Sequence, residues 1–162
     1  MHIRISKPED LEEILLIYER ARVFMAQHGN AEQWGNGYPP RKLVEQDMEQ
    51  GNSYVCEEEA RIVGTFFYRY GADPDYRRIE GGKWINSRPY GVVHRIASAL
   101  GGRGVASFCL DWALNQCGNL RIDTHRDNIP MQNLLRRNGF TLCGTVRLAG
   151  GEERLAFQKE KK

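Results

Sequence analysis

The stretch that decides the fold runs from Tyr90 to Cys117 and reads YGVVHRIASALGGRGVASFCLDWALNQC. Its first part, Tyr90 to Ala97, has the β-branched and apolar residues typical of a strand. A glycine cluster follows, and then apolar residues recur at helical spacing from about Arg103 to Gln116, at Val105, Phe108, Trp112 and Ala113. The stretch therefore predicts a strand, a glycine turn and a helix.

The glycine turn has the composition of a phosphate-binding site. Gly101, Gly102 and Gly104 remove side chains where the strand passes into the helix, and Arg103 adds a cation. Backbone N–H groups at a helix N-terminus carry roughly half a positive charge and can closely approach an anion. The alternative is a tight turn without a ligand. The sequence matches neither a Walker phosphate loop nor the dinucleotide spacing G-x-G-x-x-G.

The rest of the chain adds elements on both sides of this unit. Its order predicts a mixed α/β sheet, with parallel crossovers in the second half. The strands are expected at 2–6, 53–57, 62–70, 120–124, 140–147 and 154–158, and the helices at 8–27, 40–50 and 127–138.

Length and composition indicate one soluble domain spanning residues 1–162. Hydrophobic residues make up 41% and charged residues 27%, and a net charge of +2 is too weak to argue for a nucleic-acid partner. The first residues contain no apolar run of signal-peptide length, so we expect a cytoplasmic protein without a membrane segment. The four cysteines lack C-x-x-C spacing, which argues against a zinc site and for reduced thiols.

Two blocks together resemble the GNAT superfamily of N-acetyltransferases. Gly101 to Ala106 is similar to the last part of that family's acetyl-CoA motif, with Gly101 in the place of an Arg or Gln, and NIPMQNLLRRNGF from Asn128 to Phe140 is similar to its Asn-led helix. A closer resemblance is to uncharacterised bacterial members, in QWGNGYP (33–39), HRIA (94–97) and DTHRDN (123–128).

The resemblance implies a GNAT acyl-CoA N-acyltransferase fold with six to seven strands and about four helices. It also implies acetyl-CoA as co-substrate, no metal, and a small-molecule or peptide amine as acceptor. By resemblance, Asn128 contacts the pantetheine arm or the acetyl end. The cofactor-binding residues so expected are Ile96, Ala97, Ser98, Gly101, Gly102, Arg103, Gly104, Val105, Ala106 and Asn128.

The resemblance implies direct attack of the amine on the thioester, which requires a base. His94 is the leading candidate because imidazole has a pKa of about 6.5, and the alternative is a structural histidine. Strand alternation predicts that His94 and Arg95 face opposite sides of the sheet. Asp123 and His125 share one face of the next strand and form a second polar group. We expect this pair to act as a base or as a substrate-anchoring site near the cofactor thiol, whereas Asp127 is expected to cap the following helix.

Leu135 occupies the place where the family carries a tyrosine as general acid, so we assign no acid. Trp34, Tyr38 and Trp84 are candidates for an aromatic wall around an amine, and the alternative for each is loop anchoring. Two functions follow: an N-acetyltransferase acting on a primary amine, or a catalytically weak acyl-CoA-binding sensor or interaction module. Use of another acyl-CoA and assembly as a homodimer are left open.

Overall fold

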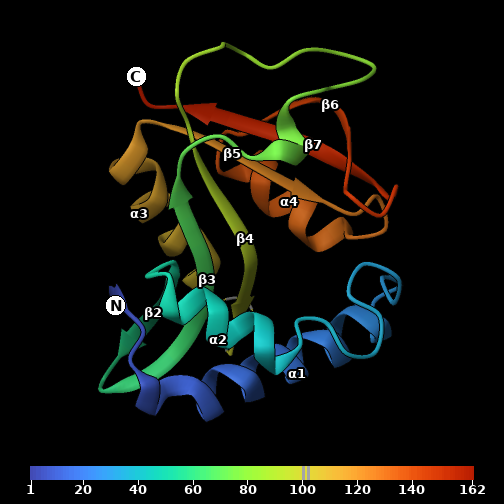
Figure 1. Cartoon of the computed structure of the whole chain (residues 1–162). Coiled ribbons are helices and arrows are strands. Elements are labelled where there is room, and N and C mark those ends of the chain that lie inside the picture. Colours follow the sequence, from blue (N-terminus) through green and yellow to red (C-terminus); the bar gives the residue numbers. More distant parts are fainter. Residues whose placement is uncertain (100, 102) are drawn as a thin grey trace.

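The structure is a computed structural model that describes residues 1–99, 101 and 103–162, so Gly102 lies outside the described residues. One mixed sheet forms its centre, in the order β1-β2-β3-β4-β5-β7-β6 (Figure 1). Its strands are β1 (His2–Ile5), β2 (Ser53–Glu58), β3 (Arg61–Tyr70), β4 (Gly91–Ser98), β5 (Asn119–Thr124), β6 (Thr141–Arg147) and β7 (Glu153–Glu160). The helices are α1 (Leu11–Gln27), α2 (Arg41–Glu49), α3 (Val105–Cys117) and α4 (Ile129–Arg137), with 3-10 turns η1 (Pro8–Asp10) and η2 (Pro74–Tyr76).

This order of elements confirms the predicted fold class. β4 and β5 are parallel neighbours joined through α3. β7 is antiparallel to both β5 and β6, so β6 runs parallel to β5 with β7 between them. Among the described residues, no helix combines the length and apolarity needed to cross a membrane.

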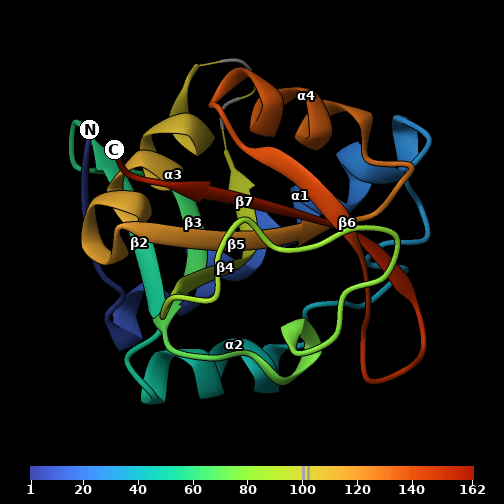
Figure 2. The same cartoon turned by 90° about the horizontal axis from the view of Figure 1, so that it is seen from above.

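Helices cover both faces of the sheet, as the view from above shows (Figure 2). On one face, Leu110 of α3 and Leu135 of α4 pack in one core cluster with Phe157 of β7. On the other face α1 and α2 bury Ile14 and Val44. Each such side chain contributes about 1.5–3 kcal/mol when it is fully removed from water.

The connection between β3 and β4 covers the remainder of the second face, and Arg121 of β5 holds it there. The Arg121 guanidinium lies 4.1 Å from the ring centroid of Trp84 and 4.0 Å from that of Tyr90. Its Nη2 donates a hydrogen bond to the carbonyl oxygen of Asn86 at 2.8 Å. Trp84 in turn donates a hydrogen bond from Nε1 to the carbonyl oxygen of Tyr76 in η2 at 3.0 Å, which ties η2 to the same group of contacts.

A β-bulge changes the direction of side chains in β4. The ladder with β3 passes from Phe67 opposite His94 to Thr65 opposite Ala97, so two residues of β4 lie across from one of β3. Arg95 is the residue in the left-handed region, with φ of 51°. Because both His94 and Arg95 contact the Phe67 ring, they lie on the same side, and the prediction that they face opposite sides is wrong.

Candidate active site

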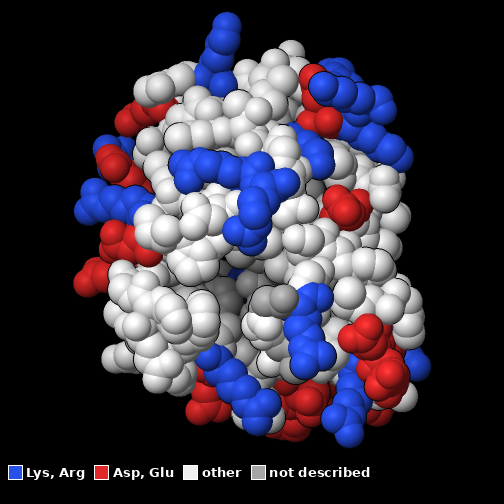
Figure 3. Space-filling model, turned by 180° about the vertical axis from the view of Figure 1, so that it is seen from behind, with Lys and Arg blue, Asp and Glu red and all other residues white. Residues whose placement is uncertain are grey.

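A cleft of about 1090 Å³ opens where β4 and β5 diverge. Within the described part of the chain, the two strands pair only at Gly91 with Leu120 and at Val92 with Arg121. Beyond these pairs, His94 to Ser98 and Ile122 to Thr124 line the two sides of the cleft. Seen from behind, the hollow has arginine or lysine side chains at its rim (Figure 3).

The glycine turn and the first turn of α3 form one end of the cleft. Gly104 caps α3 with φ of 76°, a conformation that residues with a Cβ rarely adopt. All the cofactor-binding residues expected from the sequence line this cleft, apart from Gly102, which lies outside the described residues. Arg20, Arg103 and Arg137 also line it, and none of the three has an ion pair with another described residue.

Asn128 closes the N-terminus of α4 and lines the cleft as well. Its Oδ1 accepts a hydrogen bond from the backbone N of Met131 at 3.1 Å, and its Nδ2 donates to Oε1 of Gln33 at 3.0 Å. The helix cap is therefore Asn128, and the prediction that Asp127 is the cap is wrong.

The segment 29–40 crosses the cleft and is bound to both of its sides. The carbonyl oxygen of Gln33 accepts from Nη2 of Arg154 on β7 at 3.2 Å. On the other side, the Tyr38 hydroxyl accepts from Nη1 of Arg95 on β4 at 3.1 Å. Trp34 lies between Tyr18 and Tyr38, with ring centroids 5.7 and 6.1 Å away, and both Trp34 and Tyr38 line the cleft.

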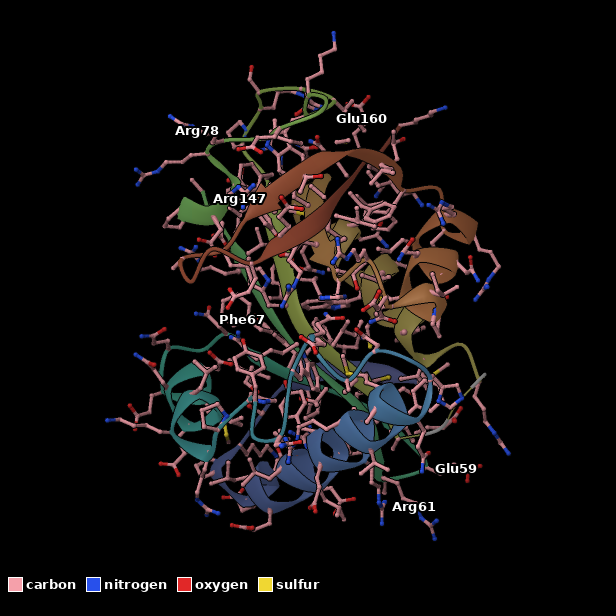
Figure 4. The ribbon with its side chains drawn as sticks, turned by 90° about the vertical axis from the view of Figure 1, so that its right-hand side faces the viewer. Glu59, Arg61, Phe67, Arg78, Arg147 and Glu160 are labelled. Atoms are coloured by element: carbon pink, nitrogen blue, oxygen red, sulfur yellow. The ribbon has the colours of Figure 1, made fainter. Side chains whose placement is uncertain are left out.

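His94 lies in the cleft between two carboxylates. Its Nε2 is 2.8 Å from Oδ2 of Asp73, and its Nδ1 is 3.9 Å from Oδ2 of Asp123. The centroid of the His94 ring lies 5.4 Å from that of Phe67. In Figure 4, Phe67 lies between the helices α1 and α2 on one side and the strands β6 and β7 on the other. The side chain is 24% exposed, so it is held firmly and is still accessible from the cleft.

Asp123 is held in place by Tyr76 of η2 and Arg154 of β7. The Tyr76 hydroxyl donates a hydrogen bond to Oδ2 at 2.6 Å, and Nε of Arg154 lies 4.0 Å from Oδ1. Burial, followed by the charge of Asp123, raises the pKa of Tyr76 well above its ordinary value. The hydroxyl therefore stays protonated and acts as the hydrogen-bond donor. Asp75 also lines the cleft, and burial, Asp73 and Asp123 raise its pKa.

His125 does not join the His94 group. It lines a neighbouring pocket of about 290 Å³, where Glu32, Arg126 and Arg154 also lie. Its Nδ1 accepts a hydrogen bond from the backbone N of Asp127 at 3.0 Å. Burial, followed by the charge of Arg154, lowers its pKa and favours the neutral ring.

Trp84 stands apart from the residues that line the cleft. Its Nε1 donates to the carbonyl oxygen of Tyr76 at 3.0 Å, and its ring stacks on Arg121. The structure thus gives it the contacts of a loop anchor.

Sequence reasoning missed four residues of this site, Asp73, Tyr76, Thr124 and Arg154. Asp73 and Tyr76 lie in the long connection 71–89, and the length of this connection indicated a functional segment. Its amino-acid sequence does not indicate which residue would bind a histidine. Thr124 is 1% exposed and lines the cleft, and its hydroxyl has no hydrogen-bond partner among the described residues. Leu135, at the place of the family's tyrosine, is fully buried in the core.

Known structures share this architecture along the whole chain. No family model matches the sequence, and no curated protein matches it either. A GNAT-family acetyltransferase from Streptococcus agalactiae 2603 is 33% identical, with 99% of this chain and 95% of that chain covered and a TM-score of 0.91.

Two more distant structures show the fold alone. Ribosomal-protein-alanine N-acetyltransferase from Brucella melitensis is 22% identical, with 99% of both chains covered and a TM-score of 0.67. A Salmonella typhimurium protein, solved with its cofactor acetyl-CoA, is 17% identical, with 99% of this chain and 94% of that chain covered and a TM-score of 0.64. At 33% identity over nearly its whole length to the streptococcal enzyme, the chain belongs to the GNAT family of acetyltransferases.

Proposed function

We propose that this protein transfers the acetyl group of acetyl-CoA to a primary amine, by direct attack of the amine on the thioester. The observation that carries the proposal is the position of His94. It lies in the split between β4 and β5, is bonded to Asp73, and opens into the same cleft as the N-terminus of α3. A base and an anion-binding helix end thus share one cavity.

The α3 end of the cleft suits the phosphates of coenzyme A. Gly101 and Gly104 leave backbone N–H groups open to an anion, and Arg103 and Arg137 have guanidinium groups that can neutralise it. The diverging backbones of β4 and β5 leave room for an extended chain with amide groups. The Salmonella typhimurium protein of the same fold has acetyl-CoA as its cofactor, which supports this use of the cleft.

The protein's main contribution would be to position the reactants. Holding an amine against a thioester supplies roughly 7–11 kcal/mol in favourable cases, whereas one general base supplies about 10²–10⁴-fold in rate. An alkylamine has a pKa of about 10.4 and enters as an ammonium ion at neutral pH, so His94 must first take its proton. A thiol with a pKa of about 8.5 leaves readily as a thiolate, which suits a chain with Leu135 in place of the family's tyrosine.

The acceptor would approach from the side of segment 29–40. Trp34 and Tyr38 present aromatic surface there, and Asp75 and Asp123 present carboxylates. This combination favours an amine carried on a small molecule or on a peptide.

A screen for acetyl transfer tests the proposal. Release of free thiol from acetyl-CoA would be measured with amino acids, polyamines, aminoglycosides and peptides with a free N-terminus. Acceleration by at least one class of amine is expected, and calorimetry should detect coenzyme A binding. Failure to bind coenzyme A at millimolar concentration would overturn the proposal.

A second candidate function is a sensor that binds acyl-CoA without efficient transfer. It is favoured by Leu135, which is buried and stands in place of the family's usual tyrosine. Binding of coenzyme A, slow hydrolysis of acetyl-CoA and no acceleration by any amine in the screen would favour the sensor.

A further inference from the structure

We infer that Asp73 is a positioning residue that holds a proton on His94 Nε2, so that Nδ1 is the base. We infer also that the space between His94 Nδ1 and Asp123 Oδ2, called here the ammonium site, receives the acceptor amine in its charged form. This inference rests on the proposed function and names its acceptor class, aliphatic ammonium compounds.

The first step is the tautomer of His94. Nε2 lies 2.8 Å from Oδ2 of Asp73, and an ionised carboxylate can only accept a hydrogen bond. Burial opposes ionisation of Asp73, but its hydrogen bond with His94 and the charge of His94 outweigh burial and lower its pKa. In the neutral ring, the proton therefore lies on Nε2 and the lone pair on Nδ1.

Asp73 is itself fixed by the fold. Its Oδ1 accepts from the backbone N of Asp75 at 2.9 Å, and its own backbone N donates to the Tyr90 hydroxyl at 2.9 Å. It is 8% exposed and does not line the cleft, whereas His94 and Asp123 do. An acceptor can therefore reach Nδ1 of His94, while Nε2 is taken up by a carboxylate that no ligand in the cleft touches.

The second step is the gap beside Nδ1. The 3.9 Å between Nδ1 and Oδ2 of Asp123 is longer than a hydrogen bond, which spans about 2.7–3.2 Å. Both atoms are hydrogen-bond acceptors, so no hydrogen bond links them while the ring is neutral. One ammonium nitrogen placed about 2.9 Å from each would donate to both. Oδ2 already accepts from Tyr76, and a carboxylate oxygen has two lone pairs, so one remains for the amine.

The charges around His94 favour a cation in this space. Asp73, Asp75 and Asp123 bring three carboxylates toward the ring, and Tyr76 is uncharged. Among the nearby cations, the Arg95 guanidinium binds Asp47 of α2 through two hydrogen bonds. Arg154 lies on the far side of Asp123, 4.0 Å from Oδ1. A neutral arylamine or a hydroxyl compound gains less from such a site than an alkylammonium ion.

The transfer then balances as follows. The ammonium group of the acceptor gives one proton to Nδ1, which leaves a neutral amine and an imidazolium held by Asp73. The amine lone pair forms the C–N bond at the thioester carbonyl carbon, and the C–S bond breaks with its electron pair on sulfur. The second proton of the amine passes to the thiolate. His94 finally returns its proton to solvent, so that one amide, one thiol and one proton are produced.

A nitrogen NMR experiment tests the tautomer without any need for turnover. With ¹⁵N-labelled histidine and neutral rings, wild-type His94 should show a protonated Nε2 and an unprotonated Nδ1. In Asp73→Asn the amide can donate to Nε2, so the proton should move to Nδ1. Asp111→Asn, an exposed carboxylate on α3, should leave the spectrum of His94 unchanged. A protonated Nδ1 in the wild type would overturn the inference.

Kinetics with ethylamine and aniline as acceptors test the ammonium site. Asp123→Asn should raise KM for ethylamine at least tenfold, change KM for aniline less than threefold, and leave coenzyme A affinity unaltered. Asp73→Asn should lower kcat by roughly 10²–10⁴-fold, as expected for loss of a correctly protonated base, and Asp73→Glu should restore part of it.

The outcomes separate this inference from the proposed function. If the wild type acetylates ethylamine but Asp123→Asn affects both acceptors equally, the ammonium site is wrong and the acetyltransferase stands. If the wild type acetylates aniline but not ethylamine, the acceptor class is likewise wrong. If no amine is acetylated, the proposed function fails, and the NMR experiment still decides the tautomer.

Discussion

Asp47 of α2 binds Arg95 of β4 through two parallel hydrogen bonds, Nε to Oδ2 at 3.0 Å and Nη2 to Oδ1 at 2.9 Å. Both side chains are buried, with 10% of Arg95 and 8% of Asp47 exposed. Arg95 is the bulge residue with positive φ, a conformation that persists only when its surroundings hold it. This pair therefore supports the bulge that turns Arg95 to the same side of β4 as His94.

We predict that Asp47→Ala destabilises the fold by about 3–5 kcal/mol, because it leaves the Arg95 charge buried without a carboxylate partner. Urea denaturation measures the free energy of unfolding. Glu45→Ala on the same helix removes the exposed ion pair with Arg41 and should change it by less than about 0.5 kcal/mol. Equal losses in the two variants would show that the burial of the Asp47 pair does not matter.

We predict that Thr124→Val stabilises the free protein by about 1 kcal/mol, because it replaces a buried hydroxyl that lacks a partner among the described residues. The same change should weaken coenzyme A binding severalfold if that hydroxyl binds the ligand. Thermal unfolding and calorimetry measure the two effects, with exposed Thr141→Val as the matched control. Unchanged coenzyme A affinity in Thr124→Val would remove Thr124 from the binding site.

We predict that Trp84→Phe leaves KM for the acceptor unchanged, whereas Trp84→Ala destabilises the protein by about 3 kcal/mol and lowers kcat. The phenyl ring keeps most of the contact with Arg121, and the alanine releases the connection that carries Asp73. Steady-state kinetics and denaturation of both variants make the comparison. A raised KM in Trp84→Phe with normal stability would instead place Trp84 in the acceptor site, as the sequence suggested.

We predict that stability falls as the pH drops below about 6.5, in part because of His125. Its pKa is lowered in the folded state by burial and by Arg154, so the unfolded chain binds a proton first. The contribution of this residue is thus complete above the unfolded pKa and is lost as the pH falls through the folded value. His125→Gln should flatten the dependence of the free energy of unfolding on pH between about 7.5 and 5.

Local pattern was sufficient to predict the elements of this fold, and it failed where distant parts of the chain decide the geometry. The strand Tyr90 to Ala97 and the helix after it follow from apolar spacing, and the structure has both within two residues. Alternation failed at Arg95, because its conformation depends on Asp47, which lies 48 residues earlier. The amino-acid sequence of β4 alone does not predict a bulge of this kind.

The residues of the site also fall into those that the sequence could predict and those that depend on the fold. Residue chemistry singled out His94, and the structure places it with Asp123, which the sequence also proposed. Asp73 could not be found, because its role depends on the fold bringing it to a histidine 21 residues later. The aromatic candidates show that residue type alone does not decide whether a loop residue lines the cleft. Trp34 lines the cleft while Trp84 packs under Tyr76, although both are tryptophans in loops.

Where β4 and β5 diverge, each strand has an unpaired edge that faces the other, so the sheet has two inner borders in addition to its two outer edges. An open border normally invites another strand to add to it, and with it the risk of aggregation. Here both inner borders lie inside the molecule, beneath segment 29–40, which is tied to Arg95 on one side and Arg154 on the other. Segment 29–40 therefore lies where a foreign strand would have to approach these borders.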